Sequence, residues 1–193
     1  MDLIIQIIHG KINMKGAAEF TKKRFDYPIV AVEIGVERGG NAEDMLSQMN
    51  IKRLYLVDDY KPYTDYLGGE CPQDVQDWVY REMFRRVSRY FDKTVLVAQN
   101  SMFAVELFPD EFFDFIYIDG NHNYESVKQD LNAWWPKTKK CGVFSGHDFD
   151  LSGVADIRHD VTDAVIEFAK EKNLEYQTFV GDNPQFSDWV IIR

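Results

Sequence analysis

Two short stretches combine carboxylates with imidazoles at spacings that could support catalysis. "YIDGNH" carries Asp119 and His122, and "FSGHDF" carries His147 and Asp148. Each follows an apolar run of strand-like composition, and the parallel strands of an open α/β sheet end at the same edge, where ligands bind. Two carboxylates and an imidazole can hold a divalent cation, and an imidazole of pKa ~6.5 can accept a proton at neutral pH. A metal-free hydrogen-bonded pair of His147 and Asp148 is the alternative interpretation.

The stretch "VEIGVERGGN" predicts a ligand-binding turn between a strand and a helix. Its Gly35 and Gly39 would let the backbone approach a ligand without a Cβ in the way. The stretch lacks the G-x-G-x-x-G pattern of dinucleotide-binding domains, and Glu33 would repel a pyrophosphate but attract an ammonium group. A turn whose glycines serve packing alone is the alternative.

The stretch "LYLVDD" predicts an acidic contact to a nucleoside. Asp58 lies at the ~20-residue offset from the glycine turn at which an acidic residue binds ribose hydroxyls. A carboxylate accepts two hydroxyl hydrogen bonds without rearranging. Asp59 is the alternative residue, because the strand end could shift by one position, and a solvated acidic turn is the alternative interpretation.

Alternating short and long patterns predict the elements that position these residues. Runs of β-branched or aromatic residues alternate with segments of helical period, which is typical of a parallel sheet with crossover helices. The predicted strands are Ile29–Ile34, Arg53–Val57, Thr94–Ala98, Phe113–Ile118 and Gly142–Ser145, and the predicted helices cover 41–49, 73–91, 123–135 and 158–172. Two strand-like runs with no helix between them, 174–181 and 188–193, predict an antiparallel pair at a sheet edge.

The composition bounds the class of protein and its partners. The chain has 193 residues, 45% of them hydrophobic, which suffices for one domain with a sizeable core. The net charge of -10 disfavours nucleic acid as a partner, and two cysteines without metal-ligand spacing suit a reducing cytoplasm. The apolar start, residues 1–16, carries Asp2 and is too short to span a membrane. We therefore expect an amphipathic helix there, packed on the domain or on a second subunit.

Four stretches resemble, in their order along the chain, the class I S-adenosylmethionine-dependent methyltransferases, and most closely the O-methyltransferase branch that includes sugar-modifying enzymes. They are "VEIGVERGGN", "LYLVDD", "FIYIDGNHNYESVKQDL" and "GVFSGHDF". The resemblance implies a Rossmann-like α/β fold with a seven-stranded, mostly parallel sheet, a C-terminal antiparallel strand hairpin and helices on both faces. It covers a methyltransferase domain at residues 29–193, preceded by an N-terminal helical extension at residues 1–28.

The same resemblance assigns roles to single residues. The residues implied for S-adenosylmethionine are Glu33, Gly35, Gly39, Asp58, Asn100 and Ser101. Asn100 and Ser101, in "VAQNS", occupy the adenine position, where they either contact the base or cap the next helix. In the metal-dependent relatives Mg²⁺ would be held by Asp119 together with the pair His147 and Asp148, and His122 would be the catalytic base. His147 replaces an acidic residue there, which favours weak Mg²⁺ binding or Mn²⁺.

The predicted function is transfer of a methyl group from S-adenosylmethionine to a hydroxyl of a small molecule or sugar, in the cytoplasm and without nucleic acid or membrane partners. The segment "DYKPYTDYLGGECPQD" is expected to be a loop at the mouth of the site that covers the acceptor. A non-catalytic S-adenosylmethionine-binding protein is one alternative. A dinucleotide-dependent oxidoreductase is a weaker one, because the glycine pattern is missing. Whether the chain forms a homo-oligomer stays open.

Overall fold

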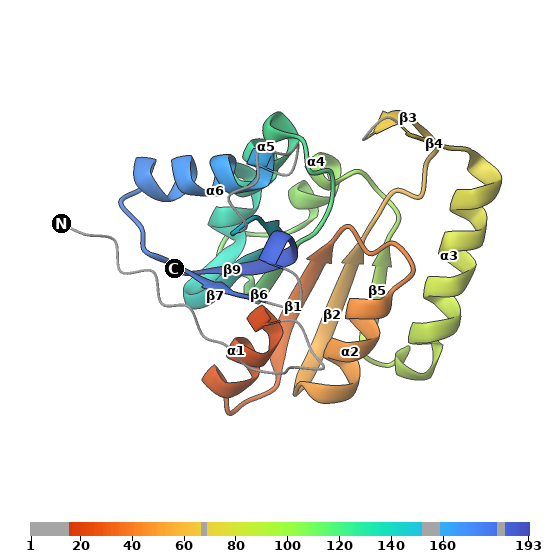
Figure 1. Ribbon diagram of the computed structural model, residues 1–193. Coiled ribbons are helices and arrows are strands. Elements are labelled where there is room, and N and C mark those ends of the chain that lie inside the picture. Colours follow the sequence, from red (N-terminus) through yellow and green to blue (C-terminus); the bar gives the residue numbers. More distant parts are fainter. Residues whose placement is uncertain (1–15, 67–68, 152–158, 181–183) are drawn as a thin grey trace.

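A seven-stranded sheet forms the centre of the computed structural model, which describes residues 16–66, 69–151, 159–180 and 184–193 (Figure 1). The strand order is β5-β2-β1-β6-β7-β9-β8. The strands are β1 (Ile29–Ile34), β2 (Ile51–Val57), β5 (Thr94–Val97), β6 (Phe113–Ile118), β7 (Thr138–Phe149), β8 (Tyr176–Phe179) and β9 (Ser187–Ile192). Neighbouring strands from β5 to β7 pair in parallel, which confirms the pattern predicted from the apolar runs.

The last two strands complete the sheet by antiparallel pairing. β9 pairs with both β7 and β8, so it lies between them and β8 forms the edge. Trp189, Val190 and Ile191 are buried, and an apolar strand of this kind is better placed inside a sheet than at its edge. The predicted Rossmann-like fold, with its C-terminal antiparallel hairpin, is therefore confirmed.

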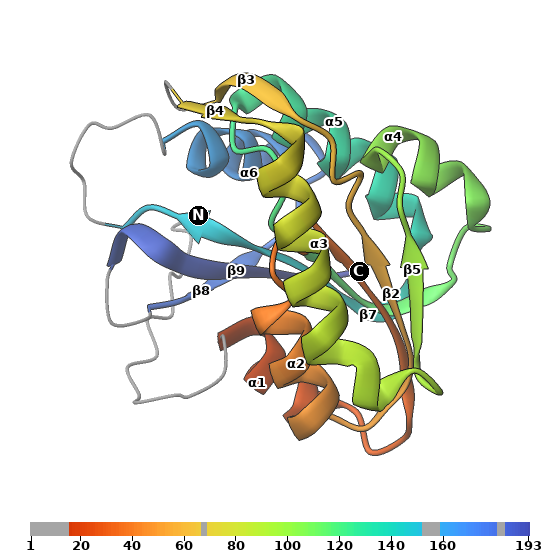
Figure 2. The ribbon, with the colours of Figure 1, turned by 90° about the vertical axis from the view of Figure 1, so that its right-hand side faces the viewer.

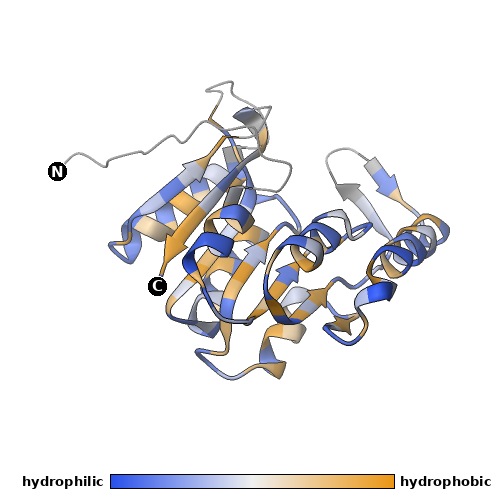
Figure 3. Ribbon diagram, turned by 90° about the horizontal axis from the view of Figure 1, so that it is seen from below, coloured by the Kyte–Doolittle hydropathy of each residue, from blue (hydrophilic) through white to orange (hydrophobic). Residues whose placement is uncertain are grey.

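Helices cover both faces of the sheet (Figure 2). One core cluster joins the strands to α1 (Gly16–Arg24), α2 (Gly40–Gln48) and α3 (Gln73–Val87), and another joins them to α4 (Ser101–Ala104), α5 (Tyr124–Trp134) and α6 (His159–Glu171). Hydrophobic residues are frequent along the strands between these helices (Figure 3). Asn123 caps α5, because its Oδ1 accepts the Ser126 N–H at 2.9 Å.

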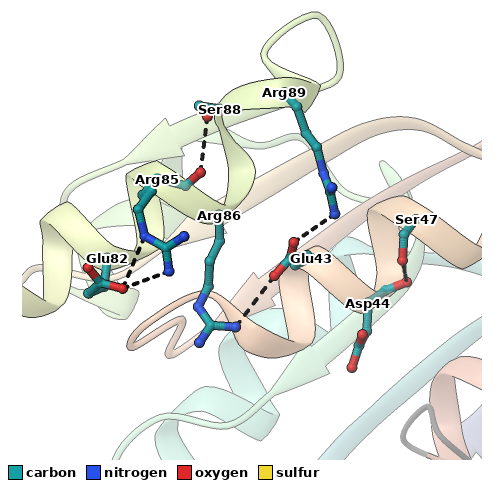
Figure 4. A network of polar contacts seen from close by, with 8 residues as sticks. All are labelled: Glu43, Asp44, Ser47, Glu82, Arg85, Arg86, Ser88 and Arg89. Carbon is teal, nitrogen blue, oxygen red and sulfur yellow. Dashed lines mark hydrogen bonds and ion pairs between the residues drawn. The ribbon is translucent and has the colours of Figure 1, made fainter.

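A network of ion pairs spans the outer surfaces of α2 and α3 (Figure 4). The Glu43 carboxylate lies 2.7 Å from Arg89 Nη2 and 3.4 Å from Arg86 Nη1. Beneath it, Met45 and Met83 are fully buried. Burial of apolar surface contributes most to this packing, since exposed ion pairs are worth little.

β7 is longer than the sequence predicted. It runs over Thr138–Phe149, whereas the apolar run alone indicated Gly142–Ser145. Lys140 and Cys141 are exposed, and Cys141 has a left-handed φ of 61°. The strand bulges there, because its pairing with β6 changes register, and exposed polar residues at a bulge hid the extension from the hydropathy pattern.

The tyrosine-rich segment after β2 contains a hairpin where the sequence predicted a loop. β3 (Tyr63–Tyr66) pairs antiparallel with β4 (Gly69–Cys71). Tyr60, at the start of the segment, packs edge-on against Tyr80 of α3, and its hydroxyl donates to the Glu37 carbonyl at 3.3 Å. These contacts attach the segment to the glycine turn, and its role over the acceptor stays a prediction.

α1 connects the predicted N-terminal extension to the sheet. Ala17 and Ala18 are fully buried, and the Ala17 N–H donates to Asp188 Oδ2 of β9 at 2.7 Å. Residues 1–15, on which most of the predicted amphipathic helix falls, lie outside the described residues. Among the helices that the structure describes, none has the length and apolarity needed to cross a membrane.

Candidate active site

The glycine turn after β1 is shaped by close backbone packing. Gly35 has a φ of 81°, and a Cβ there would lie 2.1 Å from the carbonyl oxygen of Asp119. Gly39 has a φ of 72° and precedes α2. Both positions therefore require glycine for reasons internal to the fold, as the packing interpretation stated. The turn still lies at the carboxyl end of β1, where open α/β sheets bind ligands.

Asp58 holds this turn in place. Its Oδ2 accepts the N–H groups of Val36 and Glu37, both at 3.0 Å, and its Oδ1 accepts the Tyr60 N–H at 3.1 Å. Burial raises the pKa of Asp58, while these three hydrogen bonds oppose the rise. A carboxylate has about four acceptor positions, so one is left for a ribose hydroxyl. Among donors in the described part of the chain, Asp59 accepts only the Lys61 N–H, at 3.2 Å.

Glu33 lies inside the protein, below the turn. It is 1% exposed, and its Oε1 accepts a hydrogen bond from Asn41 Nδ2 at 2.8 Å. Burial raises the pKa of the Tyr60 hydroxyl far above its usual value, and the negative charges of Asp58 and Glu33 add to the rise. The Glu33 carboxylate thus contributes a negative potential beneath the turn, which suits the predicted ammonium ligand.

Asn100 and Ser101 both serve the local structure. Asn100 Oδ1 accepts the Met102 N–H at 3.0 Å and so caps α4, which is one of the two roles left open by the sequence. Ser101 Oγ accepts the indole N–H of Trp134 at 2.8 Å and donates its hydrogen to Asp130 Oδ1. Neither observation tests a contact to adenine, which stays a prediction.

Asp119, His122 and Asp148 form one cluster at the carboxyl ends of β6 and β7. Each offers a ligand atom within 4.8 Å of the other two. His122 Nε2 lies 3.1 Å from Asp148 Oδ2 and 3.5 Å from Asp119 Oδ1. The structure thus brings the two predicted motifs together at one edge of the sheet.

Burial and backbone conformation make this cluster costly for the fold. The side chain of Asp148 is 8% exposed, and that of Asp119 is 19% exposed. Two carboxylates this close repel each other, more strongly where water is excluded. Asp148 also has a left-handed φ of 56°, which residues other than glycine adopt infrequently. Such strain is concentrated at functional sites.

His147 is not one of the three residues of this cluster, and its predicted role as a cation ligand stays a prediction. Its Nδ1 is 3.1 Å from Asp188 Oδ1 of β9. Asp188 is 2% exposed and also accepts the Tyr117 hydroxyl at 2.8 Å. The pairing of β7 with β9 changes register between Gly146 and Phe149, so this end of β7 departs from regular strand geometry. Among the described residues, His122 completes the group of possible cation ligands instead.

A hollow lies beside the cluster. Its lining includes His122 and His147 together with Gly120, Asn121 and Trp189. The lining combines two imidazoles with apolar and amide groups.

Two acidic residues of this region were missed by sequence reasoning. Asp130 lies on the buried face of α5 beside Val127, Leu131 and Trp134, and Asp188 lies in the apolar run of β9. A charged residue in an otherwise apolar stripe is the signal that could have identified them, because buried carboxylates require partners.

The sheet order, the terminal antiparallel strand and the turn without a dinucleotide pattern define a class I S-adenosylmethionine-dependent methyltransferase. Residues 32–149 match the model of a family described as a methyltransferase domain, and the chain belongs to that family. No curated protein sequence matches the chain.

Solved structures share the fold. Spermidine synthase from Thermotoga maritima superposes with a TM-score of 0.62 at 16% identity, over 93% of this chain and 57% of the synthase, so the chain spans little more than half of that protein. The 1,6-didemethyltoxoflavin-N1-methyltransferase of Burkholderia thailandensis, solved with S-adenosylhomocysteine, gives 0.59 at 15% identity, over 91% of this chain and 75% of that enzyme. An rRNA methylase from Streptococcus thermophilus gives 0.57 at 12% identity, over 91% and 93%. At these identities the likeness shows the fold alone.

Proposed function

We propose that this chain transfers a methyl group from S-adenosylmethionine to a hydroxyl of a small molecule or sugar. The observation that carries the proposal is the cluster of Asp119, His122 and Asp148 at the strand ends. Methyl transfer from a sulfonium is an in-line displacement, which requires positioning of the acceptor and removal of its proton. The cluster supplies groups for both tasks.

The cofactor would bind along the carboxyl ends of β1, β2 and β5. In this proposal its methionine part lies on the turn of Gly35 and Gly39, above the buried charge of Glu33. Its ribose contacts the remaining acceptor position of Asp58, with Asp59 as the neighbouring alternative. The adenine lies near Asn100 and Ser101, at the start of α4.

The donor set of the cluster fits a divalent cation. Asp119 and Asp148 would hold it through carboxylate oxygens, and a cation there would offset their mutual repulsion. In this proposal His122 does not coordinate the cation, because a ring nitrogen bound to a metal has no lone pair left to accept a proton. When bound, such an ion lowers the pKa of a coordinated hydroxyl.

His122 is proposed as the group that receives the acceptor proton. Its Nε2 lies within 3.5 Å of both carboxylates, so an acceptor hydroxyl near these acids is also near the imidazole. The imidazolium that forms is stabilised by the two negative charges beside it. Asp119 therefore has a direct part in catalysis as well.

A small-molecule acceptor is proposed on electrostatic grounds. The structural relatives act on chemically different acceptors, by their names a toxoflavin nitrogen and rRNA, so the fold does not choose among them. The net charge of -10 opposes binding to a nucleic acid backbone. In this proposal the reacting hydroxyl lies at the hollow lined by His122 and His147.

Mass spectrometry of an acceptor panel tests the proposal. We expect a methylated product from S-adenosylmethionine and a phenol or sugar, and loss of the product with EDTA. His122→Asn should lower kcat by about 10²- to 10⁴-fold, the scale of general acid–base catalysis, with unchanged cofactor Kd. His147→Asn is the matched control and should retain cation dependence. Cofactor binding without turnover on hydroxyl acceptors would contradict the proposal and favour a binding protein.

A further inference from the structure

The two edges of the sheet are covered to different degrees. At one edge, β8 is mostly buried, and its Phe179 packs against Phe20 of α1 with ring centroids 5.6 Å apart. At the other edge, β5 is mostly half-buried, and in the part of the chain that the structure describes no strand lies beyond it. Figure 2 faces this edge and shows β5 between α3 and α4. Within the described chain, β5 is therefore the open edge of the sheet.

The open side of β5 presents backbone hydrogen-bonding groups. The carbonyls of Lys93 and Val97 accept N–H groups on the β2 side, at 2.8 and 3.3 Å. Successive residues of a strand direct their backbone groups to opposite edges, so those of Thr94 and Leu96 face away from β2. An edge strand of this kind is a template for pairing with another chain.

Large apolar side chains are exposed on both sides of this edge. On α3 and shortly after it, ring contacts join Tyr80 to Phe84, with centroids 6.4 Å apart, and Phe84 to Phe91, with centroids 4.9 Å apart. At α4 and the turn that follows it, Phe103 is 73% exposed and Leu107 is 65% exposed. Single exposed apolar residues are ordinary, but apolar residues gathered at one place mark an interaction surface. Together with β5, these five side chains form what we call the β5 edge surface.

The order of charges along α3 makes this surface complementary to itself. The first eight residues of α3 carry Asp74 and Asp77 and no basic residue, whereas the last seven carry three arginines and one glutamate. Asp74, Asp77, Arg81 and Arg85 are exposed, and the ion pair of Arg85 with Glu82 is itself exposed and therefore weak. If two copies met with α3 antiparallel, the acidic half of each helix would face the basic half of the other.

This charge order favours a second copy over other occupants. A two-fold axis brings the same patch of both copies together, and it makes their equivalent helices antiparallel when it crosses them at right angles. Opposite charges then meet at both ends of the contact, which fixes its orientation. An unrelated acidic partner would be repelled by Asp74 and Asp77, and a basic one by Arg81 and Arg85.

We propose that the β5 edge surface is the interface of a homodimer, in which α3 and β5 of one copy lie antiparallel to those of the other. The exposed aromatic side chains of α3 would then be covered by their own counterparts, and burial of apolar surface would stabilise the pair. The inference does not depend on the proposed function, because none of these residues belongs to the cluster of Asp119, His122 and Asp148.

Sedimentation equilibrium of the full chain tests the interface. We expect a dimer whose dissociation constant rises about 30-fold or more in Phe84→Glu, the effect of a central interface residue. Ile166→Glu is the matched control, because Ile166 of α6 is 40% exposed and Phe84 is 41% exposed, and it should keep the dimer. A monomer at every concentration of the unaltered chain would overturn the proposal. An undiminished dimer of Phe84→Glu, shown by thermal melts to be folded, would overturn it as well.

A mixing experiment tests the antiparallel arrangement with substitutions of exposed residues only. One variant carries Asp74→Arg and Asp77→Arg, and the other carries Arg81→Glu and Arg85→Glu. Alone, each should dimerise about tenfold or more weakly than the unaltered chain, because like charges would meet across the axis. An equimolar mixture should form heterodimers with about the affinity of the unaltered chain. Variants that dimerise undiminished on their own, or a mixture that stays monomeric, would overturn the proposal.

Discussion

The two ends of the site use acidic residues in opposite ways. At the turn after β1, Asp58 accepts three backbone N–H groups and thereby stabilises the loop that surrounds it. At the ends of β6 and β7, Asp119 and Asp148 crowd together around the imidazole of His122, within 4.8 Å. The first arrangement lowers the energy of the fold, whereas the second raises it through charge repulsion.

This difference distinguishes acids that hold the backbone in place from acids that we propose take part in the reaction. A carboxylate that accepts backbone N–H groups can be explained by the fold alone, and a ligand takes only what acceptor capacity remains. Crowded carboxylates on adjacent strands cost stability, and such costs are usually found where function requires them. We therefore propose that the cofactor binds at the turn after β1. The acceptor hydroxyl binds and loses its proton at the ends of β6 and β7.

Asp148→Asn should have the largest effect, and it should impair the acceptor region at the ends of β6 and β7 alone. Turnover should fall by about 10³-fold or more, because the acceptor loses electrostatic stabilisation, while the melting temperature stays or rises as one repelling charge disappears. Product formation and thermal melts measure both quantities. A less stable variant with unchanged turnover would mean that Asp148 supports the fold and not the reaction.

Gly35→Ala should disrupt the cofactor region by destabilising the fold. Its Cβ would meet the Asp119 carbonyl oxygen at 2.1 Å, at a φ of 81°, so we expect about 3 kcal/mol or more of destabilisation. Gly120→Ala has open space and should cost less than about 1 kcal/mol. Urea unfolding measures both variants, and equal losses would refute the distinction between the two glycines.

Asp130 adds a pH dependence to stability. Its pKa of about 6 in the folded chain exceeds the usual value of 3.8, so the folded chain binds this proton more tightly than the unfolded chain. Its stabilising contribution is complete below pH ~4 and is lost as the pH rises through about 6, a change of about 3 kcal/mol. Relative to the unaltered chain, Asp130→Asn should therefore gain that amount between pH 4 and pH 7. A pH-independent difference in unfolding free energy would contradict this.

Asp58→Asn tests how much Asp58 contributes to the turn after β1 and to cofactor binding. An amide has a single acceptor oxygen, so it cannot accept both the N–H groups of Val36 and Glu37 and that of Tyr60, and we expect a loss of about 1.5 to 3 kcal/mol in stability or in cofactor affinity. Asp59→Asn is the control and should change either by less than about 0.5 kcal/mol. If calorimetry finds unchanged cofactor affinity in both variants, neither Asp58 nor Asp59 binds the ribose.

Glu43→Gln should have the smallest effect. This residue bridges α2 to Arg86 and Arg89 (Figure 4). Exposed pairs of this kind contribute at most about 1 kcal/mol, and salt screens them. Urea unfolding at low and high ionic strength measures the loss. A larger, salt-insensitive loss would mean that charge, and not apolar burial, holds α2 against α3.

Sequence patterns were sufficient for the strand ends but not for side-chain direction. Asp119 and Asp148 each follow an apolar run, so the topology of a parallel sheet brings them to one edge, as predicted. Which imidazole joins them depends on the irregular end of β7 and on the buried carboxylate of Asp188, contributed by a strand that is distant in sequence. Hydropathy carries no information on that choice.

The roles of Gly35 and Asp130 show the same limit. The glycine turn was recognised from composition, but its tight contact with the Asp119 carbonyl depends on how closely β1 and β6 approach. Asp130 lies within a helical stripe that was interpreted as an apolar core face, and its partner Ser101 lies on a separate helix. Contacts between distant segments decide both cases.

Binding of Mn²⁺ to the full chain tests the central distinction most directly. Paramagnetic resonance of free Mn²⁺ would be followed during titration of the unaltered chain, Asp148→Asn and Asp58→Asn. We predict one site in the unaltered chain, its loss in Asp148→Asn and its retention in Asp58→Asn. Absence of binding to the unaltered chain, or equal binding by Asp148→Asn, would contradict the account that the acids of β6 and β7 are arranged for a cation and those of the first turn for the backbone.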